Sequence, residues 1–204
     1  LDYIDGADLV ANDNIETVIL PGISRAYGME LLLRKNSGRH KYWIAYTLSK
    51  SEQKTPGRNS NEDGINMSQW YNTPYDKTHD FSINSEYNIN KKLKIVGNFI
   101  FQTGQPTNHP NSQYNYMNLN VPNYSERNSQ RLPNYHRLDI NLTLTPKRNN
   151  KKIESSWVFG IYNIYDRDNA SSIIFRRNNE TLKNEAVQIS IFGIVPSVTY
   201  NFKF

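Results

Sequence analysis

The residues of this chain that could bind a metal or transfer protons are its histidines and acids. The four histidines lie far apart in a chain without cysteine: His40, His79, His109 and His136. Because zinc sites use closely spaced His and Cys ligands, this spacing does not favour a metal site. Asp76 and Asp80 lie close together, but no nucleophile motif or glycine-rich phosphate loop accompanies them. We therefore expect no enzyme activity, no metal and no cofactor.

Aromatic residues in asparagine-rich segments are the better candidates for binding. They form two groups: Trp70, Tyr71 and Tyr75, then Tyr114, Tyr116 and Tyr124. Their rings offer flat apolar faces, and neighbouring amides can form hydrogen bonds, a combination that suits a sugar or a peptide. The alternative is that tyrosines near strand ends anchor a barrel at the level of lipid headgroups. We expect the six residues to contact a ligand or a partner protein, with the anchoring role kept open.

The elements that would position these residues are β-strands, because apolar and polar residues alternate over most of the chain. The clearest case places Leu138, Ile140, Leu142 and Leu144 opposite polar residues, a period that no helix has. Similar alternation predicts about seven strands, near residues 25–34, 42–48, 79–88, 93–102, 138–145, 154–161 and 187–204. In the last of them the apolar positions change from odd to even numbers. We expect a β-bulge near Gly193 and Pro196 to absorb this change.

The connections between these strands alternate between short and long. Short polar turns are expected near 36–40, 88–92 and 147–152, and long outside loops at about 50–78, 104–135 and 165–186. This pattern is typical of an up-and-down transmembrane β-barrel, which has short turns on the periplasmic side. The terminal Phe204 then lies at the periplasmic rim. Four acids fall on the polar sides of the strands and are predicted to face the lumen: Glu30, Asp80, Glu86 and Asp139.

Composition excludes other classes. No stretch approaches the roughly 20 apolar residues that a membrane-spanning helix needs, and a formal net charge of +5 with scattered basic residues does not favour nucleic-acid binding. A soluble all-β binding module is a weaker alternative, which predicts that Leu138, Ile140, Leu142 and Leu144 pack in a dry core. The favoured fold is all-β and antiparallel, a segment of a larger transmembrane barrel. We expect residues 1–204 to be the C-terminal part of one barrel domain, because seven strands cannot close and no signal peptide begins the chain.

Several segments, in order along the chain, are similar to those of a known family. They begin at Arg25 (Arg-Ala-Tyr-Gly-Met-Glu), Trp43 (Trp-Ile-Ala-Tyr-Thr-Leu-Ser-Lys-Ser), Tyr75 (Tyr-Asp-Lys-Thr-His-Asp), Leu132 (Leu-Pro-Asn-Tyr-His-Arg-Leu-Asp), Tyr162 (Tyr-Asn-Ile-Tyr-Asp-Arg) and Pro196 (Pro-Ser-Val-Thr-Tyr-Asn-Phe-Lys-Phe). Together they resemble the closing part of TonB-dependent outer-membrane receptors of the Bacteroidetes type. The resemblance implies a barrel of about 22 strands with a plugged lumen. This chain would supply roughly its last third, without the N-terminal plug domain and TonB box.

The resemblance also implies a function and a location. Such receptors are integral to the bacterial outer membrane and take up a siderophore, cobalamin, a glycan or a peptide with energy transmitted by TonB. The implied partners are the remainder of the barrel and plug, the TonB system acting through the missing N-terminal part, a surface lipoprotein, and outer-membrane lipid. The alternative function is a receptor-like barrel that serves as a structural or interaction platform in an outer-membrane complex. A plug and TonB box upstream of Leu1 would favour uptake over the platform.

Overall fold

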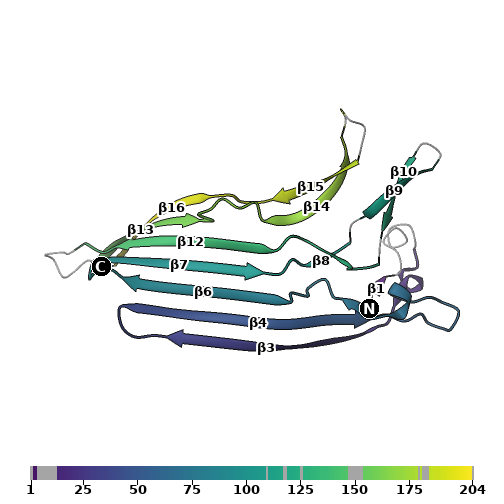
Figure 1. The fold of residues 1–204 in the computed structure, drawn as a ribbon, viewed down its shortest axis with the longest axis horizontal. Helices are drawn as coiled ribbons and strands as arrows, with labels where there is room; N and C mark the ends of the chain where they lie inside the picture. Colours follow the sequence, from purple (N-terminus) through teal and green to yellow (C-terminus); the bar gives the residue numbers. More distant parts are fainter. Residues whose placement is uncertain are drawn as a thin grey trace. The chain divides into compact units, whose positions relative to one another are not determined.

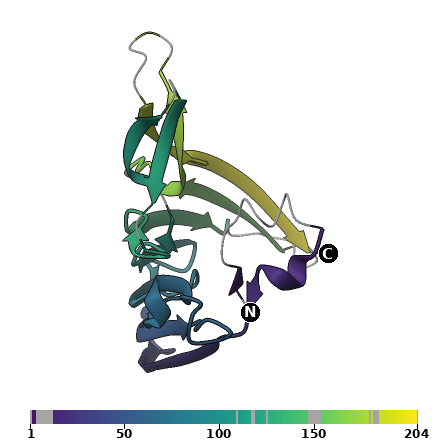
Figure 2. The same ribbon diagram turned by 90° about the vertical axis from the view of Figure 1, so that its right-hand side faces the viewer.

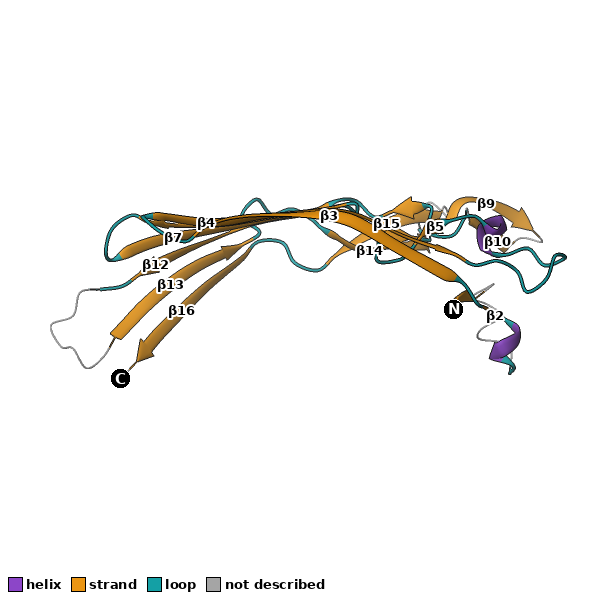
Figure 3. Ribbon diagram, turned by 90° about the horizontal axis from the view of Figure 1, so that it is seen from below, coloured by secondary structure: helices purple, strands orange, loops and turns teal. Residues whose placement is uncertain are grey.

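The chain is all-β, and eight of the sixteen strands in the described residues form one antiparallel sheet (Figure 1). The computed structural model describes residues 2–3, 13–108, 110–116, 119–124, 126–146, 154–178, 180 and 184–203. Helical structure within these ranges is confined to two short 3-10 segments, η1 (Ile15–Thr17) and η2 (Ile65–Ser68), which are purple in Figure 3. No helix among the described residues is long and apolar enough to cross a membrane.

The main sheet is an up-and-down meander, as the alternation predicts. Its order is β16-β13-β12-β7-β6-β4-β3, seven strands along the main path, and a short β5 pairs with β4. The bounds are β3 Ile23–Lys35, β4 His40–Lys54, β5 Tyr71–Asn72, β6 His79–Asn88, β7 Leu93–Gln102, β12 Tyr135–Leu144, β13 Glu154–Tyr162 and β16 Val195–Lys203. The order has two ends, so the sheet is open. Figure 2 shows β16, in yellow, curving along its length.

The remaining strands form four separate pairs. These are β1 Asp2–Tyr3 with β2 Ile19–Leu20, β8 Pro106–Thr107 with β11 Gln130–Arg131, β9 Pro110–Tyr116 with β10 Leu119–Tyr124, and β14 Ala170–Arg177 with β15 Asn184–Ser190. The predicted long loops at 104–135 and 165–186 therefore contain strand pairs of their own.

The chain divides into two compact units. Unit 1 comprises Leu1–Gly28, Ser49–Lys77 and Gly104–Leu132, and unit 2 comprises Met29–Leu48, Thr78–Thr103 and Pro133–Phe204. Most of the main sheet belongs to unit 2. The buried apolar side chains of the described residues are Val18, Leu20, Ile65, Tyr71 and Pro106, which all lie in unit 1.

The strand registers of unit 2 place apolar side chains on one face over six strands. Ile44 pairs with Ile83, Ile83 with Phe99, and Phe99 with Leu138, while Leu142 pairs with Phe159 and Phe159 with Val198. Paired residues of antiparallel strands point to the same side. We call this the apolar face; its main members are Tyr42, Ile44, Tyr46, Leu48, Phe81, Ile83, Tyr87, Ile95, Phe99, Phe101, Leu138, Ile140, Leu142, Leu144, Trp157, Phe159, Ile161, Val198, Tyr200 and Phe202. None of these side chains is buried.

The opposite face of the same strands is mostly polar. Asp80 pairs with Gln102, Asn84 with Asn98, and Glu86 with Lys41. A few apolar residues interrupt this polar face, among them Trp43, Val96, Ile100 and Val158. Each of these six strands therefore has one polar side and one apolar side, and no apolar side chain of the apolar face is buried.

Aromatic residues concentrate toward the ends of the apolar face. Tyr46 contacts Phe81 near the ends from which the long loops leave, with 6.5 Å between ring centroids. At the opposite end Trp157 contacts Tyr200 at 4.6 Å. Strand centres carry mainly aliphatic residues such as Ile44, Ile83 and Ile140.

The predicted single strand at 187–204 is wrong. Residues 184–190 belong to β15, which pairs with β14, whereas β16 begins at Val195 and pairs with β13. The change of apolar phase marks two strands in different sheets, not a bulge within one. Asp166 stabilises the intervening bend, because its Oδ1 accepts a hydrogen bond from the Ile194 amide at 2.7 Å. Phe204 lies outside the described residues, so its predicted position is not tested.

Candidate functional site

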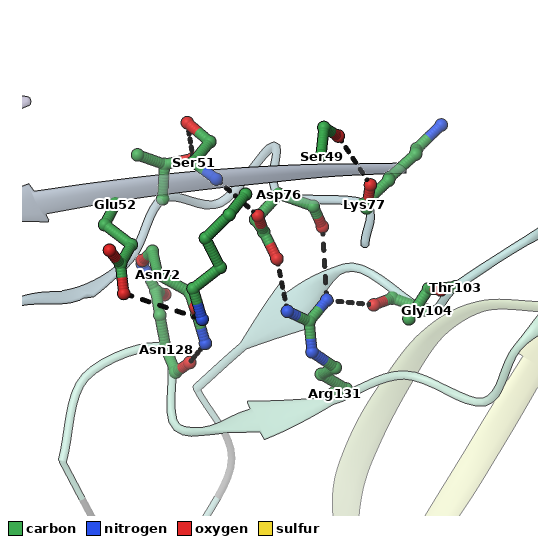
Figure 4. Close-up of polar contacts among 12 residues, drawn as sticks. Ser49, Ser51, Glu52, Asn72, Asp76, Lys77, Thr103, Gly104, Asn128 and Arg131 are labelled. Atoms are coloured by element: carbon green, nitrogen blue, oxygen red, sulfur yellow. Dashed lines mark hydrogen bonds and ion pairs between the residues drawn. The ribbon is translucent and has the colours of Figure 1, made fainter. Parts of the chain in front are cut away.

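The loops of unit 1 are joined by a buried ion pair between Asp76 and Arg131 (Figure 4). The Asp76 side chain is 0% exposed; its Oδ1 accepts a hydrogen bond from the Ser51 amide at 2.6 Å, and its Oδ2 accepts one from Arg131. Arg131 also donates to the carbonyl oxygens of Asp76 at 3.2 Å and Gly104 at 2.9 Å. One guanidinium thus holds the end of the first long loop and the start of the second against β4. The bonds satisfy both charges, so this pair serves structure.

A second polar cluster surrounds the phenol of Tyr71. Its oxygen donates to Asp2 at 2.8 Å and lies 2.8 Å from the Thr55 hydroxyl and 3.0 Å from the Gln53 amide nitrogen. Arg127 donates to the other Asp2 oxygen at 2.7 Å. Burial raises the pKa of Tyr71 above its ordinary value, and the neighbouring Asp2 carboxylate acts in the same direction.

Asparagine side chains fix these loops by bonding backbone groups in pairs. Asn66 accepts from the Arg127 amide at 2.7 Å and donates to the Arg127 carbonyl at 3.0 Å. Asn72 and Asn128 each donate to the carbonyl of the other, at 3.4 and 2.8 Å. In unit 2 the side chain of Asn169 bonds both backbone groups of His136. Asparagine side chains therefore supply the backbone hydrogen bonds that a neighbouring strand would supply within a regular sheet.

A depression of about 260 Å³ opens beside this framework. Its lining includes Ser24 and Arg25 of β3, Ser51 and Gln53 of β4, and Thr73 and Tyr75 of the following loop. Arg25 bonds Glu52 through Nε and Nη2 at 3.0 and 2.8 Å, and its guanidinium lies 4.1 Å from the centroid of the Trp70 ring. Tyr75 is 83% exposed. Hydroxyls, an amide, a fixed guanidinium and an open ring are suited to a polar ligand with a flat face.

The predicted aromatic residues have different surroundings in the structure. Trp70 is half-buried beneath Arg25, and Tyr71 is only 5% exposed, so its ring stabilises the loop. Tyr75 is open beside the depression, and Tyr114 and Tyr124 are 56% and 58% exposed on the β9–β10 hairpin. Among described side chains, no hydrogen bond or ring contact joins these last two to the first group. The side chain of Tyr116, at the end of β9, lies outside the described residues.

Three of the four acids predicted to face the lumen share the polar face of unit 2. Asp80 accepts from Gln102 at 2.7 Å, Glu86 bonds Lys94 at 3.2 Å and Lys41 at 3.5 Å, and Asp139 pairs with Arg137 at 2.9 Å. Glu30 follows the same alternation on β3, where it is exposed. That this polar face lines a lumen remains a prediction.

The sequence reasoning missed the arginines. Besides Arg25 and Arg131, it missed Arg137 of unit 2, which donates to the hydroxyls of Tyr135 at 2.8 Å and Tyr162 at 2.7 Å and lies 4.0 Å above the Tyr162 ring. The spacing of Tyr135, Arg137 and Asp139 could have predicted this cluster, because residues two apart on one strand share a face. Partners more than fifty residues apart, such as Asp76 and Arg131, leave no such signal.

Comparison with protein-family models, with curated proteins and with solved structures found nothing that matches this chain. Within the described ranges, no group of three or more His, Cys, Asp or Glu side chains could hold a metal ion.

Proposed function

We propose that this chain is part of a transmembrane β-barrel of the bacterial outer membrane that takes up a nutrient in the manner of TonB-dependent receptors. The observation that carries the proposal is the apolar face, which extends over six strands of unit 2 with no buried side chain. Leaving so much apolar surface in water is unfavourable, at about 25 cal/mol per Å². Contact with lipid removes that cost.

The dimensions of the strands suit a bilayer. β6, β7 and β12 each have 10 residues. At a rise of about 3.3 Å per residue and a tilt of about 40°, such strands span roughly 25 Å, the height of the apolar band of outer-membrane barrels. Aromatic residues near both ends of the apolar face fit the girdles of such barrels.

The nutrient-uptake part of the proposal rests on the family resemblance and on the depression. Segments that carry the resemblance also hold the structure together: Asp76 lies in one, and Arg137 and Asp139 lie in another. Rigid loops around an open Tyr75 and a fixed Arg25 form a preorganised binding surface. In this proposal the loops bind the nutrient, and the polar face of unit 2 lines its route.

A platform function is the second candidate, and exposed apolar side chains on the same loops favour it. Met67 is 80% exposed on a turn where Asn66, Met67 and Ser68 all have positive φ. An exposed methionine suits a protein partner better than a small polar nutrient. The soluble binding module has less support, because Leu138, Ile140 and Leu142 are only half-buried and Leu144 is 38% exposed.

Membrane embedding can be tested with the two tryptophans on opposite faces of unit 2. Trp157 is on the apolar face and Trp43 on the polar face, with similar exposures of 40% and 37%. In single-tryptophan variants of the full chain folded into vesicles, brominated acyl chains should quench Trp157 strongly and Trp43 weakly. An aqueous quencher should give the reverse order. Equal quenching of the two, or none by lipid, would contradict the proposal.

Uptake and platform functions can be separated in cells. Substitution of Tyr75 by alanine should reduce uptake of the nutrient at low concentration and leave the amount of protein in the outer membrane unchanged. Met67→Ala is the matched control, since uptake does not depend on it. If Met67→Ala instead releases a co-purifying protein while uptake is normal in both variants, the platform function is correct.

A further inference from the structure

Cations gather at the turn end of the unit 2 sheet, where β3 joins β4 and β6 joins β7 (Figure 1). The two turns are neighbours, because His40 pairs with Tyr87 and the Asn88 amide donates to the Arg39 carbonyl at 2.8 Å. Residues 35–41 and 86–94 contain one acid, Glu86, against six cations: Lys35, Arg39, Lys41, Lys91, Lys92 and Lys94. This end of the sheet therefore has a strong excess of positive charge.

The one acid of these two segments, Glu86, lies on the polar face and pairs only with cations of that face. Glu86 bonds Lys94 and Lys41. The other four cations, Lys35, Arg39, Lys91 and Lys92, are exposed and form no ion pair with any described residue. We call these four residues the basic rim. Their charges are free to attract an anion.

Arg39 connects the basic rim to the apolar face. It donates to the carbonyl oxygens of Ile89 at 2.7 Å and Asn88 at 3.5 Å, and its guanidinium carbon lies 6.0 Å from the centroid of the Tyr87 ring. Carbonyl oxygens orient the guanidinium without neutralising it. Because Tyr87 belongs to the apolar face, a fixed positive charge lies where that face ends.

The turns that present the basic rim have defined conformations. Gly38 has φ +86°, which suits glycine. The Asn90 side chain accepts hydrogen bonds from the amides of Lys92 at 2.8 Å and Leu93 at 3.0 Å. The rim is therefore a preorganised surface.

We propose that the basic rim binds the phosphate groups of anionic phospholipids at the membrane surface on the turn side. This inference rests on the proposed function, which places the apolar face against acyl chains. Cations at the end of such a face lie at headgroup level, where anionic lipids attract Lys and Arg. A soluble acidic partner would not account for the position of Arg39 beside Tyr87, a member of the apolar face.

The test measures lipid selectivity beside Arg39 in the full chain after insertion into vesicles. The reporter is Tyr42→Trp, on the apolar face next to His40 (ring centroids 5.2 Å apart), in a variant whose own three tryptophans are replaced by phenylalanine. Brominated phosphatidylglycerol and brominated phosphatidylcholine are compared as quenchers. We expect phosphatidylglycerol to be preferred by about fivefold or more, and added salt to reduce the preference because the charges are exposed.

The decisive variant combines Arg39→Gln, Lys91→Gln and Lys92→Gln. It should lose the preference for phosphatidylglycerol. A control with the same loss of charge at the loop end, Lys50→Gln, Lys54→Gln and Lys77→Gln, should keep it. The inference would be overturned if the two lipids quenched the Tyr42→Trp reporter equally in the protein with an unmodified basic rim. It would also be overturned if both triple variants lost the preference for phosphatidylglycerol to the same extent. Failure of either lipid to quench would instead contradict the membrane embedding on which it rests.

Discussion

Among single residues, Asp76 has the largest predicted effect on unit 1. Asp76→Ala leaves the Ser51 amide and Arg131 without their carboxylate partner. Because the Arg131 side chain is 27% exposed and partly screened, we expect a loss of about 2–3 kcal/mol, below the full value for a buried pair. Urea unfolding of the loop, followed by the fluorescence of Trp70, measures the loss.

An exposed ion pair provides the control for Asp76. Arg176 and Glu185 have side-chain exposures of 62% and 36%, so water screens their attraction and Arg176→Gln should leave stability almost unchanged. If both substitutions shift the urea midpoint equally, the buried pair does not organise the loops.

Tyr71 should make the stability of unit 1 depend on pH in the alkaline range. Burial raises the pKa of its phenol in the folded protein, so the folded state holds the proton more tightly than the unfolded state. The resulting stability is fully present below the unfolded pKa of about 10 and is lost as the pH rises through the folded pKa. Hydrogen exchange of loop amides between pH 8 and 11.5, corrected for the intrinsic rate, should show increased opening at the upper end. Tyr71→Phe should be less stable at neutral pH but should lack this alkaline loss; an unchanged alkaline profile would contradict the assignment.

Of the two loops predicted to bind a ligand, the first contributes Thr73 and Tyr75 to the depression, but the sequence does not show how the side chains of these loops are used. Aromatic composition predicted Tyr71 and Tyr75 alike as ligand contacts, whereas in the structure the ring of Tyr75 is exposed and that of Tyr71 is buried. Burial depends on contacts with Asp2, Gln53 and Thr55, which are distant along the chain and leave no local pattern. The amide of Asn72 is expected to form hydrogen bonds with a ligand, whereas in the structure it donates to the carbonyl oxygen of Asn128.

At the scale of elements, periodicity predicted strands well wherever one face is apolar. β6 matches the predicted 79–88 and β7 the predicted 93–102, because a period of two residues leaves a continuous signal. The prediction failed for β15 and β16. The alternation of apolar residues shows which side of a strand is apolar, but it does not show which other strand pairs with it. Periodicity also did not predict β9, β10 or β14, because apolar and polar residues do not alternate regularly in these segments.

Adjacent residues of β12 test whether the apolar face meets lipid. Leu142 pairs with Ile95 on the apolar face, and Asn141 pairs with Val96 on the polar face. Leu142→Arg should destabilise the membrane-folded chain by about 2–4 kcal/mol, whereas Asn141→Arg should have a much smaller effect. Urea titration of the chain in vesicles gives both values. In a soluble fold with both faces in water the two substitutions would cost about the same.

At the scale of the whole molecule, the proposed membrane location means that the open sheet needs further strands at its two edges. The order of the main sheet ends at β3 and β16, and every residue of β3 and every described side chain of β16 is exposed. Edge strands present unpaired N–H and C=O groups, and each such group left unsatisfied in hydrocarbon costs several kcal/mol. If the apolar face lies in lipid, as proposed, the edges of β3 and β16 cannot remain unpaired there. Further strands must then pair with both edges.

The number of chains in each assembly tests this requirement. When the chain is inserted by itself into vesicles, only other copies can supply strands for β3 and β16, so we expect two or more chains per assembly. Single-molecule photobleaching of singly labelled protein at low density should then show two or more steps per spot. Co-insertion with the strands that complete the sheet in cells should reduce this to one step, because those strands compete for the same edges. One step per spot for the chain alone, together with lipid quenching of Trp157, would mean that β3 and β16 satisfy their edges within one chain and that the sheet closes on itself in lipid.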